Sequence, residues 1–216
     1  MASFKIFSSY LVLFAWNRLH LAQGEGETVI RSPEITHWGD WGSWDSCATG
    51  QFGIGFQIKV EEDQAEGDDT AVNAIKILCA QPRNGRTVES EPTSSTQQWG
   101  KWEGKLFCDL GLLTGFQLKV QPPQENGGDN TATNNLRGEC TSFGGEKSVI
   151  TGVGMQWGNW NEFQRCPQGH AICAIKTQIE SVMGRGKNED HLFSVFSVSF
   201  NDSQFLKFSN QVTTLH

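Results

Sequence analysis

A short tryptophan motif occurs three times in this chain and constrains its fold more than any other feature. Its copies are Trp38-Gly39-Asp40-Trp41, Trp99-Gly100-Lys101-Trp102 and Trp157-Gly158-Asn159-Trp160. The first tryptophans are 61 and 58 residues apart, and each is followed nine residues later by a cysteine, namely Cys47, Cys108 and Cys166. Such a period predicts three copies of one structural unit, none of which can bury its apolar face alone.

The first two units share further segments that the third lacks. Residues 55–60 match residues 115–120. A Gly-Asp element follows in both units and ends in a cysteine; its residues are Gly67-Asp68-Asp69-Thr70-Ala71 with Asn73 and Cys79, and Gly128-Asp129-Asn130-Thr131-Ala132 with Asn134 and Cys140. In the third unit, residues 186–190 replace this element and no closing cysteine follows.

Alternating apolar and polar residues indicate the secondary structure of each unit. Phe56, Ile58 and Val60 alternate with Gln57 and Lys59, which is the period of a strand with one buried face. No segment after residue 22 shows a sustained helical period. We therefore predict an all-β fold in which three units pack round a pseudo-threefold axis. The expected single domain covers residues 23–206, with repeats at about 37–97, 98–155 and 156–204 and a C-terminal tail at 207–216.

The N-terminal segment has the pattern of a secretory signal peptide. Lys5 precedes an apolar stretch at residues 6–16, and the segment ends near Ala22. That stretch is shorter than the roughly 20 residues that span a bilayer. We predict that residues 1–22 are a signal peptide, that the protein is secreted and extracellular, and that it has no membrane partner.

Six cysteines in an oxidising compartment predict three disulfide bonds. The repeat requires the same bridge in the first two units, Cys47–Cys79 and Cys108–Cys140, which leaves Cys166 and Cys173 to pair with each other. Each of the two longer bridges contributes roughly 3–4 kcal/mol in the chain-entropy model. Asn201 begins an Asn-Asp-Ser sequence and is a candidate glycosylation site.

Taken together, the Trp-Gly-x-Trp motif with its cysteine, the Gly-Asp-(Asp/Asn)-Thr-Ala-x-Asn element and the threefold period resemble the vitelline membrane outer layer protein 1 family. The resemblance covers about residues 28–200. It implies a β-prism of three antiparallel Greek-key sheets, and an extracellular protein of egg coats and secretions. It also implies partners in a closing strand for the cysteines equivalent to Cys166 and Cys173. This chain lacks those partners, so the Cys166–Cys173 bridge is the expected substitute.

The repeated tryptophans have two interpretations. An indole face packs well against the apolar face of a sugar ring, which would make the tryptophans carbohydrate-binding platforms. Alternatively they fill the core of the prism, where a large aromatic side chain buries roughly 150–250 Å². Repetition in three copies favours the core, because one asymmetric ligand site needs no symmetry.

The Gly-Asp loops supply the candidate glycan-binding residues Asp68, Asp69, Asp129 and Asn130. Oxygen ligands of this kind also bind Ca²⁺. The sequence has no Asp-x-Asp-x-Asp-Gly loop, however, and Asx-type hydrogen bonds within a turn are favoured. We predict no metal site and no cofactor, since the histidines lack metal-ligand spacing and no nucleotide-binding motif is present.

Glycoside hydrolysis requires two carboxylates, roughly 5–5.5 Å or 6.5–9.5 Å apart. Asp40, Glu103 and Glu162 lie beside successive Trp-Gly motifs and are the acids to inspect for such a pair. Most acids in such positions are ordinary surface residues, so we assign no catalytic role to them.

Charge and motifs together favour a binding protein over an enzyme. The formal net charge is -7, and no basic patch could neutralise phosphates, so a nucleic-acid partner is not expected. We predict a secreted, disulfide-stabilised structural or binding protein of an egg coat or mucous layer that contacts glycans or coat proteins. The alternative is a glycan-directed hydrolase or transferase acting on N-acetylglucosamine oligomers.

Overall fold

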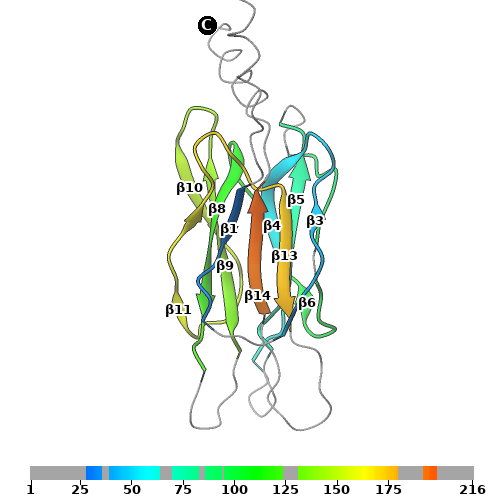
Figure 1. The fold of residues 1–216 in the computed structure, drawn as a ribbon, viewed down its shortest axis with the longest axis vertical. Helices are drawn as coiled ribbons and strands as arrows, with labels where there is room; N and C mark the ends of the chain where they lie inside the picture. The colour runs from blue at the N-terminus through cyan, green and yellow to red at the C-terminus, as the bar shows by residue number, and fades with distance from the viewer. Residues whose placement is uncertain are drawn as a thin grey trace, which may run out of the picture.

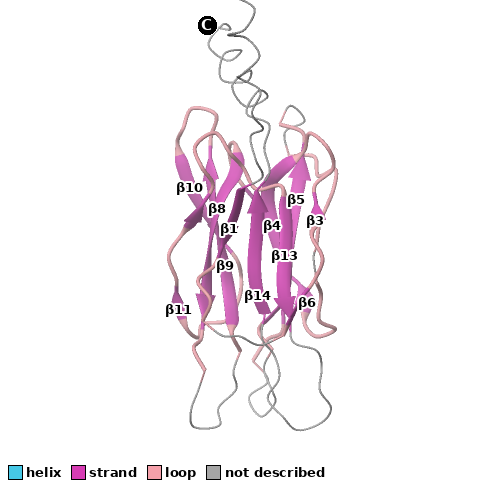
Figure 2. Ribbon diagram, in the orientation of Figure 1, coloured by secondary structure: helices cyan, strands magenta, loops and turns pink. Residues whose placement is uncertain are grey.

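The computed structural model describes residues 28–35, 39–63, 70–82, 86–93, 95–123, 131–179 and 192–198, the last as backbone only. The expected signal peptide, Asn201 and the C-terminal tail lie outside the described residues. Figure 2 shows strands joined by loops and turns throughout the described part. The predicted all-β fold is confirmed.

Three long hairpins form the centres of three antiparallel sheets. In sheet B, β4 (Phe52–Val60) pairs with β5 (Val72–Ala80). In sheet C, β8 (Leu112–Val120) pairs with β9 (Thr133–Thr141). In sheet A, β13 (Ala174–Ile179) pairs with β14 (Leu192–Val198). Figure 1 shows β13 and β14 at the centre, sheet C on the left and sheet B on the right, as the three walls of a prism.

Short strands from the tryptophan motifs complete each sheet, but always the sheet of another unit. The pair β6 (Lys101–Trp102) and β7 (Leu106–Phe107) adds to β4, and the pair β11 (Asn159–Trp160) and β12 (Gln164–Arg165) adds to β8. The first unit's pair, β2 (Asp40–Trp41) and β3 (Asp45–Ser46), adds to β13 of the third unit. The three units therefore form a closed ring.

A further strand or extended segment lies on the other side of each hairpin. β1 (Thr28–Arg31) pairs with β14, and β10 (Lys147–Thr151) pairs with β9. In sheet B an irregular segment runs along β5, where the Ile77 amide donates to the Pro92 carbonyl at 3.0 Å. The second strand of every hairpin (β5, β9 or β14) thus has hydrogen-bonding neighbours on both sides, as the backbone groups of a buried or half-buried strand require.

The core between the sheets is formed by the inward-facing residues of the long strands. Phe56, Ile58 and Val60 are buried, while Gln57 and Lys59 between them are only partly buried, so the predicted alternation is confirmed for β4. Phe116, Leu118 and Val120 repeat the arrangement in β8. Ile172 and Ile175 complete the cluster from the third unit. The corresponding residues of all three units meet in one core.

Candidate functional site

The motif tryptophans that the structure describes lie on the outside of the prism. Trp41, Trp99 and Trp102 are 44%, 43% and 36% exposed, and Trp44, three residues after Trp41, is 43% exposed. Trp157 and Trp160 are partly buried, and Trp38 lies outside the described residues. The prediction that these tryptophans fill the core is therefore wrong for those that the structure describes. The second tryptophan of each motif lies on a two-residue strand beside a long strand, and the core is already filled by side chains such as Phe56 and Phe116.

The glycine of each motif is required by the backbone. Gly39, Gly100 and Gly158 have φ values of 82°, 75° and 76°, a region that only glycine adopts readily. A Cβ on Gly100 would lie 2.4 Å from the Val60 carbonyl oxygen, and one on Gly158 would lie 2.3 Å from that of Val120. The motif turns sharply against the end of a long strand, and this turn sets the position of the tryptophan two residues later.

A cation lies over the second tryptophan of every motif. Lys76 Nζ is 4.4 Å from the ring centroid of Trp102, and Arg137 Cζ is 4.0 Å from that of Trp160. In sheet A, Lys176 Nζ is 5.7 Å from the centroid of Trp41. Each contact joins residues of two different units. At exposed sites such a contact contributes about 0.5–1 kcal/mol, so the cations orient the indoles more than they stabilise the fold.

In sheet B the cation belongs to a small ionic cluster. Lys76 Nζ lies 3.0 Å from Glu91 Oε2, and Lys105 contacts the other oxygen of the same carboxylate. Hydrogen bonds from Lys105 and then Lys76 lower the pKa of Glu91 below its ordinary value. Lys76, the cation beside Trp102, is therefore partly neutralised by an acid that it shares with Lys105.

Sheet C also carries an acid among its cations. Glu139 is 5% exposed and accepts hydrogen bonds from Arg165 Nε at 2.9 Å and from Lys147 Nζ at 2.8 Å. The Arg165 guanidinium in turn lies 4.9 Å from the centroid of the Phe163 ring. A buried carboxylate is tolerated only with such partners, so Glu139 has a structural role here.

The acids singled out for catalysis lie on three different sheets. Asp40 is on β2 of sheet A, Glu103 follows β6 of sheet B, and Glu162 follows β11 of sheet C. The repeat distributes them around the prism, so the three do not form the facing pair that glycoside hydrolysis needs.

The candidate glycan-binding residues Asp68, Asp69, Asp129 and Asn130 lie outside the described residues. The ends of their loops are described and show turn chemistry. Asn73 Nδ2 donates to Thr70 Oγ1 and, at 3.2 Å, to the Ala71 carbonyl, and Asn134 repeats both bonds with Thr131 and Ala132. These bonds hold Ala71 and Ala132 at φ values of 52° and 44°, which non-glycine residues rarely adopt.

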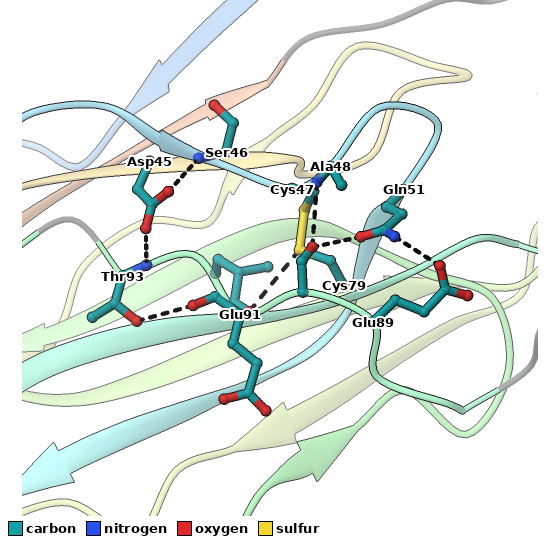
Figure 3. The surroundings of a disulfide bond; sticks show 11 residues. Asp45, Ser46, Cys47, Ala48, Gln51, Cys79, Glu89, Glu91 and Thr93 are labelled. Atoms are coloured by element: carbon teal, nitrogen blue, oxygen red, sulfur yellow. Dashed lines mark hydrogen bonds between the residues drawn. A yellow bond between two sulfur atoms is a disulfide. The ribbon is translucent and has the colours of Figure 1, made fainter.

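Two of the three predicted disulfide bonds are present, and each joins two sheets. Cys47 follows β3 of sheet A and is bonded to Cys79 on β5 of sheet B. Cys108 follows β7 of sheet B and is bonded to Cys140 on β9 of sheet C. Figure 3 shows the first bridge near Gln51 and Glu89, and the Gln51 side-chain amide donates to the Glu89 carboxylate. The Ser90 hydroxyl donates to the Gln51 side-chain carbonyl. The third corner, between sheets C and A, has no bridge among the described residues.

The expected Cys166–Cys173 bridge is not formed in the structure. Cys166 packs against the main core as Cys47 does, and burial raises the pKa of its thiol. Cys173 instead corresponds to Ile54, because the Cys47 amide donates to the Cys173 carbonyl as the Cys108 amide donates to that of Ile54. Ile54 belongs to a separate, smaller apolar cluster. The two cysteines therefore occupy repeat positions that serve different clusters.

Neither metal binding nor membrane spanning is indicated by the described residues. They contain no group of three or more His, Cys, Asp or Glu side chains arranged for a metal ion. No helix within them is long and apolar enough to cross a membrane. The feature that recurs on all three sheets is a tryptophan with an adjacent cation.

Sequence reasoning missed the cations that accompany the tryptophans. Lys76 and Arg137 each lie three residues before a disulfide cysteine, Cys79 or Cys140, and this repeated basic position was a usable signal. Lys176 does not share this repeat position, because it lies on β13, the first strand of its hairpin, whereas Lys76 and Arg137 lie on second strands.

Comparison with known proteins places the chain in a family. The profile of the vitelline membrane outer layer protein I family matches residues 28–195. The chain belongs to this family. The human vitelline membrane outer layer protein 1 homolog is 39% identical over 162 residues, covering 71% of this chain and 75% of the human protein. The mouse homolog is 37% identical over 160 residues, covering 70% and 74%. The family resemblance carried by the motifs is thus confirmed.

Three solved structures have a related chain trace. Frutapin, a lectin from Artocarpus incisa, has a TM-score of 0.46 at 12% identity and covers 81% of this family member and 99% of the lectin. The second β-prism domain of RbmC from V. cholerae has a TM-score of 0.40 at 13% identity, with 79% and 99% covered. A mannose-specific jacalin-related lectin from Morus nigra, in complex with mannose, has a TM-score of 0.37 at 12% identity, with 78% and 99% covered. Likeness at this level assigns no ligand to this chain.

Proposed function

We propose that this chain is a secreted, disulfide-stabilised structural protein of an extracellular coat or mucous layer, and that it contacts glycans through the outer faces of its prism. The observation that carries the proposal is the indole with an adjacent cation that recurs on all three sheets. A sugar ring offers C–H groups to an aromatic face and hydroxyl oxygens to a neighbouring cationic donor, so each pair matches both parts of a sugar.

The exposure of the tryptophans supports this reading. Trp41 and Trp102 leave more than a third of their surface in water, although burial of such side chains is strongly favourable. Contiguous exposed apolar patches commonly mark contact surfaces, and Trp41 and Trp44 lie beside the same lysine, Lys176. Three such surfaces on different walls would let one molecule bridge several glycan chains, and multivalent attachment strengthens weak individual contacts.

The bridges and the N-terminal pattern support the extracellular location. Cys47–Cys79 and Cys108–Cys140 join neighbouring sheets, and such bonds persist in oxidising environments. The apolar stretch at residues 6–16 is typical of a signal peptide. Both features fit a protein that must keep its shape outside the cell.

Binding of the purified mature protein to a glycan array and to mucus or egg-coat fractions tests the proposal. We expect saturable binding that falls at least tenfold when Trp41, Trp102 and Trp160 are all replaced by alanine. Leu110→Ala is the matched control, because Leu110 is 66% exposed and apolar but is not part of a tryptophan-cation pair. Equal binding by wild type and the triple variant would refute the proposed surface. Mass spectrometry of bound chitooligosaccharides tests the enzymatic alternative, since shortened products would favour it.

A further inference from the structure

The outer face of sheet A differs from the other two walls in its aromatic residues. Lys176 Nζ lies 5.7 Å from the ring centroid of Trp41 and 5.9 Å from that of Trp44. Both indoles are more than 40% exposed. The position of Trp44 in the first motif is taken by Lys105 in the second and by Phe163 in the third. Only in sheet A, among the described residues, does one cation lie beside two exposed indoles.

A second cation lies on the same face. In the strand register, Lys176 is opposite Val195 on β14, and Val195 is opposite Arg31 on β1. Residues directly opposite in antiparallel strands share a face. Ile175 and Ile30, one position earlier on β13 and β1, pack against the core, which places Lys176 and Arg31 outward. Two strand spacings, roughly 10 Å, separate their backbones.

The part of the chain that the structure describes places no acid in an ion pair with either cation. In sheet B, Lys76 and Lys105 share the Glu91 carboxylate, and in sheet C, Arg165 and Lys147 share Glu139. Among the residues that the structure describes, neither Lys176 nor Arg31 forms an ion pair. Asp40 lies opposite Ile179 rather than Gln178 and so faces away from Trp41. Asp45 is engaged elsewhere, since its carboxylate accepts hydrogen bonds from the Thr93 and Ser46 amides.

We propose that the outer face of sheet A, formed by Trp41, Trp44, Lys176 and Arg31, binds a carboxylate-bearing oligosaccharide. The sugar rings lie against the two indoles, and the carboxylates contact Lys176 and Arg31. This inference rests on the proposed function, since it names the ligand class for one of the three glycan-contacting walls.

Charge complementarity selects an acidic ligand over a neutral one. The protein has a formal net charge of -7, so an acidic sugar is repelled by most of its surface and is favoured only where cations are unneutralised. A charge-assisted hydrogen bond to a carboxylate is roughly twice as strong as a neutral one. Sheet B carries the Glu91 carboxylate beside Lys76, which disfavours an acidic sugar there and leaves sheet B suited to neutral sugars. In sheet C, Glu139 pairs with Arg165 and Lys147, while Arg137 beside Trp160 forms no ion pair with a described residue. Sheet A differs from sheet C in having two exposed indoles beside one cation.

Calorimetric titration with matched sugars tests the assignment. The probes are a hyaluronan hexasaccharide, its carboxyl-reduced neutral form, 3′-sialyllactose and lactose. The first pair tests a uronate source for the carboxylate and the second pair a sialic acid source. We expect at least one acidic sugar to bind about tenfold more tightly than its neutral partner at low salt. Lys176→Gln and Arg31→Gln should each remove most of that preference. Lys76→Gln, on sheet B, is the matched control and should leave the preference intact.

The outcomes separate this inference from the proposed function. If neutral sugars bind and their acidic partners bind no more tightly, sheet A has no acidic-sugar site and the general glycan proposal stands. If Lys76→Gln removes the preference while Lys176→Gln does not, the site is on sheet B and the inference is overturned. If none of the sugars binds, and the glycan array is also blank, both proposals fail. Circular dichroism of each variant establishes that lost binding is not lost folding.

Discussion

Val198 occupies, relative to Cys166, the position that Cys79 and Cys140 occupy relative to their own disulfide partners. Phe196 on β14 is opposite Ile175 on β13, as Ile77 on β5 is opposite Phe56 on β4. Two residues further along β5, Ile77 is followed by Cys79, and two residues further along β14, Phe196 is followed by Val198. The third corner of the prism thus has its first cysteine but not its second.

Val198→Cys is expected to form a disulfide bond with Cys166 and to raise the free energy of unfolding by about 3–4 kcal/mol, the chain-entropy value for a loop of this length. Denaturant unfolding and the mass shift after alkylation of free thiols measure both effects. The double variant Val198→Cys with Cys166→Ser should show no gain. The assigned register would be contradicted if, in the Val198→Cys variant under oxidising conditions, Cys166 and the new cysteine were alkylated along with Cys173.

Gly100→Ala should destabilise the protein by more than about 2 kcal/mol, because the new Cβ would meet the Val60 carbonyl in a backbone region that alanine avoids. Gly104→Ala is the control, since its Cβ would have no neighbour within 4 Å, and it should stay within about 0.5 kcal/mol of wild type. Urea unfolding measures both. Equal stability of the two variants would show that the motif glycine is not needed for the turn.

Asn73→Ala should lower the free energy of unfolding by about 2–3 kcal/mol. The buried Asn73 side chain donates hydrogen bonds to the Thr70 hydroxyl and to the carbonyl of Ala71, which has a positive φ. The loss should be smaller in an Ala71→Gly background, because glycine adopts the positive φ without help. A double-mutant cycle from denaturant unfolding gives this coupling. Strictly additive effects would mean that Asn73 does not hold the strained residue in place.

Glu91 should make the stability of the protein pH-dependent in acid. Its pKa is lowered by Lys105 and Lys76, so its contribution is fully present above the unfolded-state pKa and is lost as the pH falls through the lower folded-state value. Glu91→Gln should therefore flatten the fall in unfolding free energy between about pH 5 and about pH 3. The cluster is partly exposed, so we expect an effect of at most about 1 kcal/mol. Glu146→Gln, at an exposed turn, should keep the wild-type profile, and added salt should shrink the difference.

The fold class and two of the disulfide bonds could be predicted from the sequence, because equivalent residues recur in successive repeats. Cys47–Cys79 had to match Cys108–Cys140, and the alternation around Phe56 marked a half-buried strand. The place of the tryptophans did not follow. The sequence does not indicate which face of a strand an aromatic side chain occupies. In the structure Phe56 and Phe116 fill the core, and Trp41 and Trp102 lie on the surface.

The cationic partners could be predicted only in part. Lys76 and Arg137 share a repeat position on the second strands of their hairpins. Lys176 instead corresponds to Gln57 and Gln117, which lie on first strands. A cation over an indole therefore recurs in three units although the residue that supplies it moves from one strand to the next. Alignment of the repeats does not reveal such an exchange, because each pair is made within one sheet between residues of two different units.

The exchange of short strands between units has a consequence for how such a fold is assembled. A unit cut out of this chain has lost the partners of its own long hairpin and carries a strand pair that fits another hairpin. Three free copies could satisfy one another only by each lending that pair to its neighbour in a ring, which is the arrangement of a domain-swapped trimer. This chain has the same arrangement within one polypeptide. Deleting any one repeat should therefore leave two sheets incomplete, one without its short strand pair and one without its hairpin, rather than a smaller prism.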